Sequence, residues 1–260
     1  IVGCLAPVIA PHDPLEVNVS IRLQGPSQEY WLGTDHLGRC ILSRLLYGAQ
    51  TTLLNSLVVL AGILLIGIPL GLISGFCGGW IDNLIMRFAD IVSTFPSSLL
   101  ALAVVSVFGA GLQNVMIVLV ALWWAPFARI LRSQVLKIKE KDFVMAAKAS
   151  GTSKFKIVIN HVLLNSISPI IVYSTLRVAA VIMHIASFSF IGLGTQPPAA
   201  DWGVMLSDSK QFISTAPLMM IWPGLSIMLV VFSLNMFGEG LNEALMPGGN
   251  KKAKQLGDGE

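Results

Sequence analysis

Three cysteines and four histidines are the residues best suited to metal or nucleophilic chemistry, and they lie far apart in the chain. Cys4, Cys40 and Cys77 form no Cys-x-x-Cys pair, so they predict neither a disulfide framework nor a zinc site. The sequence also has no His-Glu-x-x-His, no Gly-x-Ser-x-Gly and no Gly-x-x-x-x-Gly-Lys-Ser/Thr phosphate loop. We therefore expect a chain that is not an enzyme, has no metal centre and does not hydrolyse ATP itself.

One set of polar side chains stands out because it lies inside an apolar run. His184 is near the middle of that run, and Arg177 and Tyr173 precede it by seven and eleven residues, which places the three on nearly the same helical face. Ser187 could supply a further polar contact. Ionisable groups at membrane depth are costly and usually face a bundle interior or a wet cavity. We interpret this face as a candidate pathway for a polar solute.

A purely structural role is the alternative for these residues. His184 could hydrogen-bond a neighbouring helix, and Arg177 could pair with a carboxylate such as Asp90. A bare divalent ion would need several His, Asp or Glu ligands. One histidine therefore does not predict a metal site.

The composition of the chain predicts the helices that position this face. The chain is 54% hydrophobic and 12% charged, with a mean hydropathy of +0.75, which indicates a multispanning membrane protein. A spanning helix needs about 20 mostly apolar residues. The windows that meet this need are Thr51–Phe76, Leu84–Phe108, Gln113–Leu131, Ser168–Leu193 and Pro217–Leu241. Residues 1–10 are apolar but too short to cross, and we interpret them as the end of a first span.

Positive charge sets the expected orientation. The end of the third window and the segment that follows it contain Arg129, Arg132, Lys137, Lys139, Lys141, Lys148, Lys154 and Lys156. Because membrane proteins keep such clusters on the cytoplasmic side, we expect a cytoplasmic loop at 141–165 within a membrane core at 51–250. Residues 11–50 are then extracytoplasmic, and 251–260 form a cytoplasmic tail. The net charge of +3 reflects this topology, so no nucleic-acid partner is expected.

The cytoplasmic loop has the composition of two short helices. Ala146 and Ala147 favour a smooth helical surface, and Gly151 can end that helix in a left-handed conformation. Thr152 or Ser153 can then cap the next helix.

Large apolar side chains in so short a loop need a partner to cover them. We expect Phe143, Phe155 and Ile157 to be presented to another protein. The predicted docking residues are Phe143, Ala146, Ala147, Gly151, Phe155 and Ile157.

Small residues predict one close helix contact within the membrane. Gly67, Gly71 and Gly75 recur at every fourth position of the first complete span. That spacing lets another helix approach closely. The sequence therefore predicts a central place for this span.

An ordered set of short motifs runs along nearly the whole chain. Its members are Trp31–Arg39 (WLGTDHLGR), Leu42–Gly48 (LSRLLYG), Ala146-Ala147 with Gly151, Ser189–Gly194 (SFIGLG), Trp202-Gly203 and Trp222–Gly224 (WPG). Together they resemble the inner-membrane permease subunits of ATP-binding-cassette importers, in the dipeptide, oligopeptide and nickel branch. The chain departs from that pattern at Met145, where the family usually has Glu, and at Cys40 and Leu164.

The resemblance implies an all-α polytopic helical bundle, the transmembrane domain of a type I importer, with six spans in the intact chain. It implies four kinds of partner: a second permease subunit, two cytoplasmic ATPase subunits that dock on the loop, an extracytoplasmic solute-binding protein and the lipid membrane. ATP with Mg²⁺ would bind the ATPase subunits, and no cofactor is expected on this chain. The expected location is the cell (inner or plasma) membrane of a prokaryote.

The cargo is the least constrained expectation. Met183–Phe190 and Trp202–Pro217 look most like nickel-import permeases, which implies nickel or another transition metal carried inside an organic chelate, a metallophore. Dipeptides or oligopeptides are the alternative within the same branch. An ion-coupled secondary transporter is the alternative of another class, but Asp90 alone fits the expected intramembrane carboxylates and no internal repeat is evident.

Overall fold

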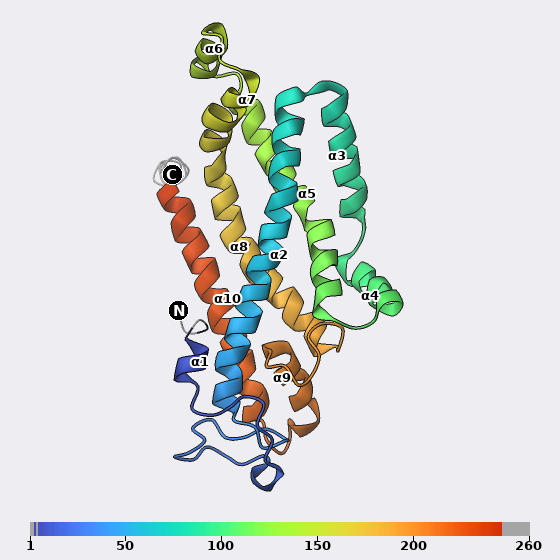
Figure 1. The fold of residues 1–260 in the computed structure, drawn as a ribbon, viewed down its shortest axis with the longest axis vertical. Coiled ribbons are helices and arrows are strands. Elements are labelled where there is room, and N and C mark those ends of the chain that lie inside the picture. Colours follow the sequence, from blue (N-terminus) through green and yellow to red (C-terminus); the bar gives the residue numbers. More distant parts are fainter. Residues whose placement is uncertain (1–2, 4, 246–260) are drawn as a thin grey trace, which may run out of the picture. The chain divides into compact units, whose positions relative to one another are not determined.

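Helices dominate the computed structural model, which describes Gly3 and residues 5–245. The long ones are α2 (Ile41–Cys77), α3 (Gly79–Thr94), α4 (Ser97–Phe108), α5 (Leu112–Ile138), α8 (Leu164–Phe190) and α10 (Leu218–Leu245) (Figure 1). The short ones are α1 (Ala6–Ile9), η1 (Val19–Ile21), α6 (Asp142–Ala149), α7 (Lys154–Lys156), the π-helical η2 (Ile157–Leu163), α9 (Trp202–Ser209) and η3 (Lys210–Phe212). Because this described range has no β-strand, the predicted all-α class is confirmed. The predicted tail at 251–260 lies outside the described residues, as do positions 1, 2 and 4 of the predicted first-span end.

Four helical stretches are long and apolar enough to cross a membrane: α2, α5, α10 and the stretch from α7 through α8. The predicted span Leu84–Phe108 is wrong as one continuous helix, because α3 and α4 meet the same criterion only as a broken pair. The chain leaves the helix at Phe95, which has φ −81° and ψ 122° and precedes Pro96. The proline ring disfavours a helical conformation at the residue before it, and proline has no N–H to donate to the helix.

The chain divides into two compact units, and α2, α5, α8 and α10 each contribute to both. The first contains the described parts of Ile1–Val59, Ser97–Leu119 and Val178–Phe232, and the second contains those of Leu60–Pro96, Val120–Arg177 and Ser233–Glu260. The first unit therefore includes α4 and α9, whereas α3, α6 and α7 belong to the second.

The second unit is built on a close contact between α2 and α5. Gly67, Gly71 and Gly75 lie directly against α5. A Cβ atom added at Gly71 would be 2.7 Å from the carbonyl oxygen of Ala128, and one added at Gly75 would be 2.7 Å from the Cβ of Val135. The predicted close approach is confirmed, and its partner is α5.

Polar side chains tie the ends of α2, α3 and α5 together within the same unit. Arg132 donates from Nε and Nη2 to the two carboxylate oxygens of Asp82 at 2.6 and 2.5 Å. Ser74 also donates to Asp82, and the ammonium of Lys139 donates to the carbonyl oxygen of Gly75 at 3.0 Å. Three helix ends are therefore fixed by one bidentate ion pair and its neighbours.

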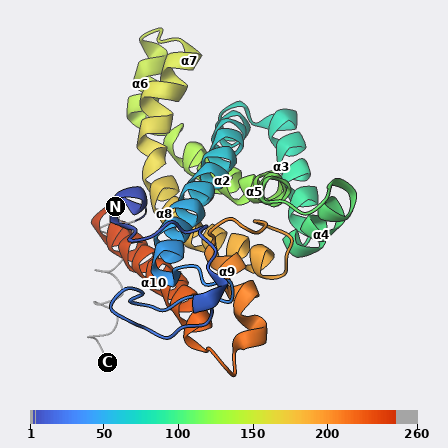
Figure 2. The same ribbon diagram turned by 60° about the horizontal axis from the view of Figure 1, so that its bottom comes forward.

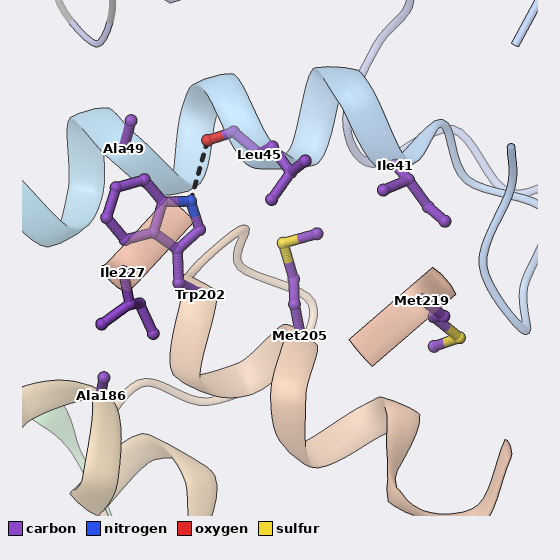
Figure 3. Close-up of a cluster of buried hydrophobic side chains, with 8 residues drawn as sticks. All are labelled: Ile41, Leu45, Ala49, Ala186, Trp202, Met205, Met219 and Ile227. Atoms are coloured by element: carbon purple, nitrogen blue, oxygen red, sulfur yellow. Dashed lines mark hydrogen bonds between the residues drawn. The ribbon is translucent and has the colours of Figure 1, made fainter. Parts of the chain in front are cut away.

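The first unit has its apolar centre where α2 begins. Trp202 at the start of α9 donates its Nε1–H to the carbonyl oxygen of Leu45 at 3.0 Å (Figure 3). Gly48 permits this approach, because a Cβ atom there would lie 2.8 Å from Trp202 Cδ1. The buried cluster comprises Ile41, Leu45, Ala49, Ala186, Trp202, Met205, Met219 and Ile227.

Buried charges organise the segment that precedes α2. Arg39 Nε donates to Asp35 Oδ2 at 2.6 Å, and its Nη2 donates to Asp208 at 3.2 Å. Arg44 is also buried and donates from Nη1 to the carbonyl oxygens of Pro14 and Pro198 at 3.2 and 3.3 Å. These charges are paired or hydrogen-bonded, which offsets the cost of removing them from water.

Asp201 caps α9 from a fully buried position. Its Oδ1 accepts hydrogen bonds from the backbone N–H groups of Gly203 and Val204 at 2.9 and 3.2 Å. Burial raises the pKa of the Asp201 carboxyl, and the bonds from Val204 and Gly203 oppose that rise. The cap therefore sets the direction in which α9 begins, and Trp202 and Met205 of this helix belong to the apolar cluster.

Substitution of Gly71 by alanine tests the α2–α5 contact. Gly71→Ala places a methyl group against the Ala128 carbonyl oxygen, and the overpacking should cost about 1–3 kcal/mol. Gly240→Ala in α10 is the matched control, because no heavy atom lies within 4 Å of its added Cβ. The measurement is the temperature at which the purified protein loses its monodisperse chromatographic peak. A Gly71→Ala protein as heat-stable as Gly240→Ala would contradict the contact.

Candidate functional site

The loop between α5 and α8 consists of two short helices joined at Gly151. Gly151 has φ +76°, the left-handed conformation predicted for it. The N–H of Thr152 donates to the carbonyl oxygen of Ala147 at 3.1 Å, which closes the end of α6. Ser153 caps α7, because its side chain accepts a hydrogen bond from the N–H of Lys156 at 3.5 Å. Of the two predicted caps, Ser153 is the one used.

Two of the three predicted apolar docking side chains lie at the surface. Phe143 in α6 is 41% exposed and Phe155 in α7 is 77% exposed. The expectation of exposure is wrong for Ile157, which is 1% exposed. The reason is that η2 packs against α6, and apolar side chains such as Ile157 and Val144 are enclosed where the two helices meet. The loop therefore has a small core of its own.

The surface of the loop projects at the start of α8. Figures 1 and 2 both show α6 and α7 as a hairpin beyond the first turns of that helix. Ala146 is exposed on α6 and Ala147 is half-buried. The loop thus combines small and aromatic side chains on one projecting element, which is a surface that another protein could cover.

The join between α7 and α8 is a π-helix that sequence analysis missed. Ile157–Leu163 forms seven π-helical residues. π-Helical segments are rare in proteins, and those that occur often lie at functional sites. His161 lies within it, and its ring is 6.4 Å from that of Phe143. No local sequence signal distinguishes this segment from an ordinary helix.

A cavity of about 690 Å³ in the first unit contains the predicted pathway residues His184 and Ser187. Side chains from α4, α8, α9 and α10 line it, and most of them are apolar. The lining residues are Ser98, Met183, His184, Ala186, Ser187, Phe188, Phe190, Ile191, Leu206, Met220, Gly224 and Ile227. The cavity is therefore a largely carbon-lined space with a few polar groups, a composition typical of organic ligand sites.

Two polar groups of this cavity, His184 and Ser187, lie within bonding distance of carbonyl oxygens of their own helix. His184 Nδ1 lies 2.9 Å from the carbonyl oxygen of Ala180, and the Ser187 hydroxyl donates to the carbonyl oxygen of Met183 at 2.7 Å. The His184 ring also lies 6.4 Å from the ring of Phe188. Within the described part of the chain, no three His, Cys, Asp or Glu side chains are grouped to hold a metal ion.

Tyr173 and Arg177 form a separate pair in the second unit. Arg177 donates a hydrogen bond to the Tyr173 hydroxyl, and its guanidinium carbon lies 4.8 Å from the Tyr173 ring centroid and 5.1 Å from that of Trp123. Stacking on aromatic rings stabilises a guanidinium away from water. The alternative pairing of Arg177 with Asp90 is wrong, because Asp90 pairs with Arg129 at 3.0 Å. The four predicted pathway residues are thus divided between the units, with Tyr173 and Arg177 in the second and His184 and Ser187 in the first.

Comparison with known proteins decides the family. A family model described as "Binding-protein-dependent transport system inner membrane component" matches residues 67–248, a range that contains the α6–α7 loop. The chain belongs to this family. It is a multi-pass permease of ABC importers, a transport subunit of the peptide, nickel and glutathione group. This assignment replaces the alternative of an ion-coupled secondary transporter.

Curated relatives of the permease transport different solutes. The dipeptide transport system permease protein of Alkalihalophilus pseudofirmus is 46% identical over 95% of this chain and 81% of its own. The nickel transport system permease protein of Escherichia coli K12 is 39% identical over 91% of this chain and 86% of its own. The glutathione transport system permease protein of Pectobacterium atrosepticum is 42% identical over 86% of this chain and 74% of its own.

Solved structures support the fold of the permease. A chain of an inward-facing methionine ABC transporter aligns with a TM-score of 0.63 and 17% identity, over 79% of this chain and 98% of that one. A second crystal form of the same transporter gives a TM-score of 0.61 at 18% identity. The transmembrane fold of a type I importer is therefore confirmed.

Gly151 provides a test of the loop, because its conformation suits glycine and no neighbouring atom restricts its size. Gly151→Val should strain the left-handed backbone at a cost of about 1–2 kcal/mol, whereas Gly151→Asn should cost less because asparagine tolerates this conformation. We expect Gly151→Val to lower the recovery of co-purified ATPase subunits and the transport rate while membrane insertion persists. If Gly151→Val supports wild-type coupling, the loop conformation has no part in docking.

Proposed function

We propose that this permease is one of two membrane subunits of an ATP-driven importer. Its other partners in the proposal are two cytoplasmic ATPase subunits, which bind ATP with Mg²⁺, and an extracytoplasmic solute-binding protein. This chain binds no cofactor in the proposal. The family assignment supports this composition, and the inner or plasma membrane of a prokaryote is the corresponding location.

The observation that carries the proposal is the exposed hairpin of α6 and α7. Phe143 and Phe155 are large apolar side chains at its surface, and Gly151 fixes the angle between its two helices. Lys148, Lys154 and Lys156 are exposed nearby, as expected of a cytoplasmic loop. An aromatic anchor surrounded by polar residues is the usual composition of a binding hot spot.

The hairpin would transmit force through the helices that carry it. When ATP draws the two ATPase subunits together, the docked hairpins would follow, and the attached helix bundles would move as rigid bodies. Lys139 and Arg132, which join the end of α5 to α2 and α3, would keep that motion from being absorbed at the base of the loop. ATP hydrolysis and release would return the bundle to its inward-open arrangement.

The cargo that we propose first is a small peptide. Two of the relatives are named for peptide solutes, a dipeptide and glutathione, and the dipeptide permease is 46% identical. The cavity beside His184 is lined mainly by carbon and has room for a small organic solute.

Nickel or another transition metal inside an organic chelate is the second candidate. The nickel permease relative is 39% identical, and Met183 and Met220, whose side chains are soft metal contacts, line the same cavity as His184. A chelate would be handled as an organic solute with an occasional metal contact.

Purification of the intact complex tests both parts of the proposal. ATPase subunits should co-purify with this chain, and mass spectrometry of the bound small molecules should identify a peptide or a metal chelate. Uptake of radiolabelled alanyl-alanine and of radionickel with free histidine, measured in the same cells, then separates the two cargo candidates. A complex that lacks ATPase subunits under mild extraction would contradict the importer assignment.

Replacement of His184 tests the second candidate. If a metal chelate is transported, His184→Ala should lower radionickel uptake several-fold, in line with one polar contact of about 1 kcal/mol. His184→Gln, which keeps a hydrogen-bonding side chain, should have a smaller effect. Uptake is normalised to the amount of inserted complex, and alanyl-alanine uptake serves as the internal control. Normal radionickel uptake by both variants would assign His184 to helix packing.

A further inference from the structure

The helix α3 has two exposed faces of opposite character. Asn83, Arg87, Asp90 and Thr94 are all exposed. They are separated by four, three and four residues, so they form one continuous stripe along the helix. This polar stripe contains a cation, an anion and two neutral hydrogen-bonding groups.

The adjacent exposed face of α3 is apolar. Leu84, Phe88 and Ile91 are exposed with four- and three-residue spacing, and the exposed Phe95 follows just after the end of the helix. The remaining face packs inside the second unit, where Ala89 is fully buried. Three faces of one helix thus have three different surroundings, and only one of them is enclosed within this unit.

Lipid can cover only one of the two exposed faces. With α4, α3 forms a pair that is apolar enough to cross a membrane. The apolar stripe suits lipid, but Arg and Asp side chains facing hydrocarbon would be very costly. At 1.5 Å per residue, Arg87 and Asp90 lie about 12 and 16 Å along the helix from Gly79, well inside a segment that would have to cross a bilayer core of about 30 Å. The polar stripe therefore needs water or polar groups in front of it.

The charges of the stripe are accessible and unbalanced. Asp90 Oδ1 accepts a hydrogen bond from Arg129 Nη2 of α5 at 3.0 Å, yet their side chains are 58% and 38% exposed. Arg129 also donates to the Ala89 carbonyl oxygen, which holds it beside α3. The Arg87 side chain makes no hydrogen bond or ion pair with any other described residue. Two guanidinium groups and one carboxylate leave an excess of one positive charge.

We propose that the polar stripe of α3 lines the water-filled translocation pathway and that Arg87 contacts a carboxylate of the passing solute. An unpaired guanidinium offers a planar set of N–H donors that matches a carboxylate. Asn83 and Thr94 extend the polar surface above and below this contact. The carboxylate is the shared chemistry of a free peptide and of an organic acid chelate of a metal. The inference rests on the proposed transport function and specifies a contact surface for its cargo.

Accessibility of substituted cysteines tests the stripe independently of the cargo. Cys4, Cys40 and Cys77 are first replaced by alanine, and the complete importer is placed in liposomes. Asn83→Cys and Thr94→Cys probe the polar stripe, and Leu84→Cys and Ile91→Cys are the matched controls at the neighbouring positions. A charged, membrane-impermeant methanethiosulfonate reagent, enclosed and added outside, should modify the polar-stripe cysteines at least tenfold faster than the controls.

Two other labelling results would overturn the proposal. Fast reaction at all four positions would place α3 in bulk water outside the membrane. Protection at all four positions would mean that another protein subunit covers the polar stripe. Neither result depends on which solute is transported, so each can be separated from a failure of the cargo assignment.

The carboxylate contact is tested by uptake in cells. Arg87→Gln should lower alanyl-alanine uptake about fivefold per inserted complex, the effect of losing one exposed charge contact, whereas Arg87→Lys, which keeps the positive charge, should retain most of it. Radionickel supplied with histidine is the second arm, and a loss confined to that arm would identify a chelate as the carboxylate source. Wild-type uptake of both solutes by Arg87→Gln would overturn the contact. The wild-type complex could also transport neither solute while the cysteines of its polar stripe are labelled. That result would contradict the proposed cargo and leave the proposed pathway intact.

Discussion

The close packing of α2 against α5 is the contact on which the second unit depends. In a bilayer, apolar side chains gain little by leaving lipid, so helix association depends on close fit and on polar bonds. Gly67, Gly71 and Gly75 provide the fit, because any larger residue would meet α5 at less than 3 Å. Since α5 leads directly into the α6–α7 hairpin, this contact also fixes the base of the proposed docking loop. Lys139 strengthens it with a bond to the carbonyl oxygen of Gly75.

Features encoded by local spacing could be predicted from the sequence. The glycine repeat of α2 defines one helical face without reference to any partner, and the left-handed conformation at Gly151 is a property of a single residue. The break at Phe95 also has a local cause in Pro96, although the apolar run continues through it. Hydropathy records how long a segment is apolar and does not record whether its helix is continuous.

Features that depend on which elements meet could not be predicted. Ile157 follows the exposed Phe155 by two residues, and nothing in the sequence shows that η2 packs against α6 and buries it. The same is true of the arginines. Asp90 could pair with any nearby cation, and Arg129 does so while Arg177 stacks on aromatic rings. A sequence indicates how deep in the membrane a side chain lies. It does not indicate which side chain is its partner, because that depends on how the helices pack.

The arginines of the second unit differ in a way that bears on transport. Arg132 is held by a bidentate bond to Asp82, and Arg177 is held by Tyr173 and Trp123, so both are committed to structure. Within the described residues, Arg87 has no such commitment, and a single exposed charge contact is worth about 1 kcal/mol or less. A contact of that size changes the residence time of a solute by less than about tenfold. A pathway must bind its solute weakly, because a tightly held solute would not be released. A side chain that is charged, exposed and otherwise unbonded meets this requirement better than a preformed high-affinity site.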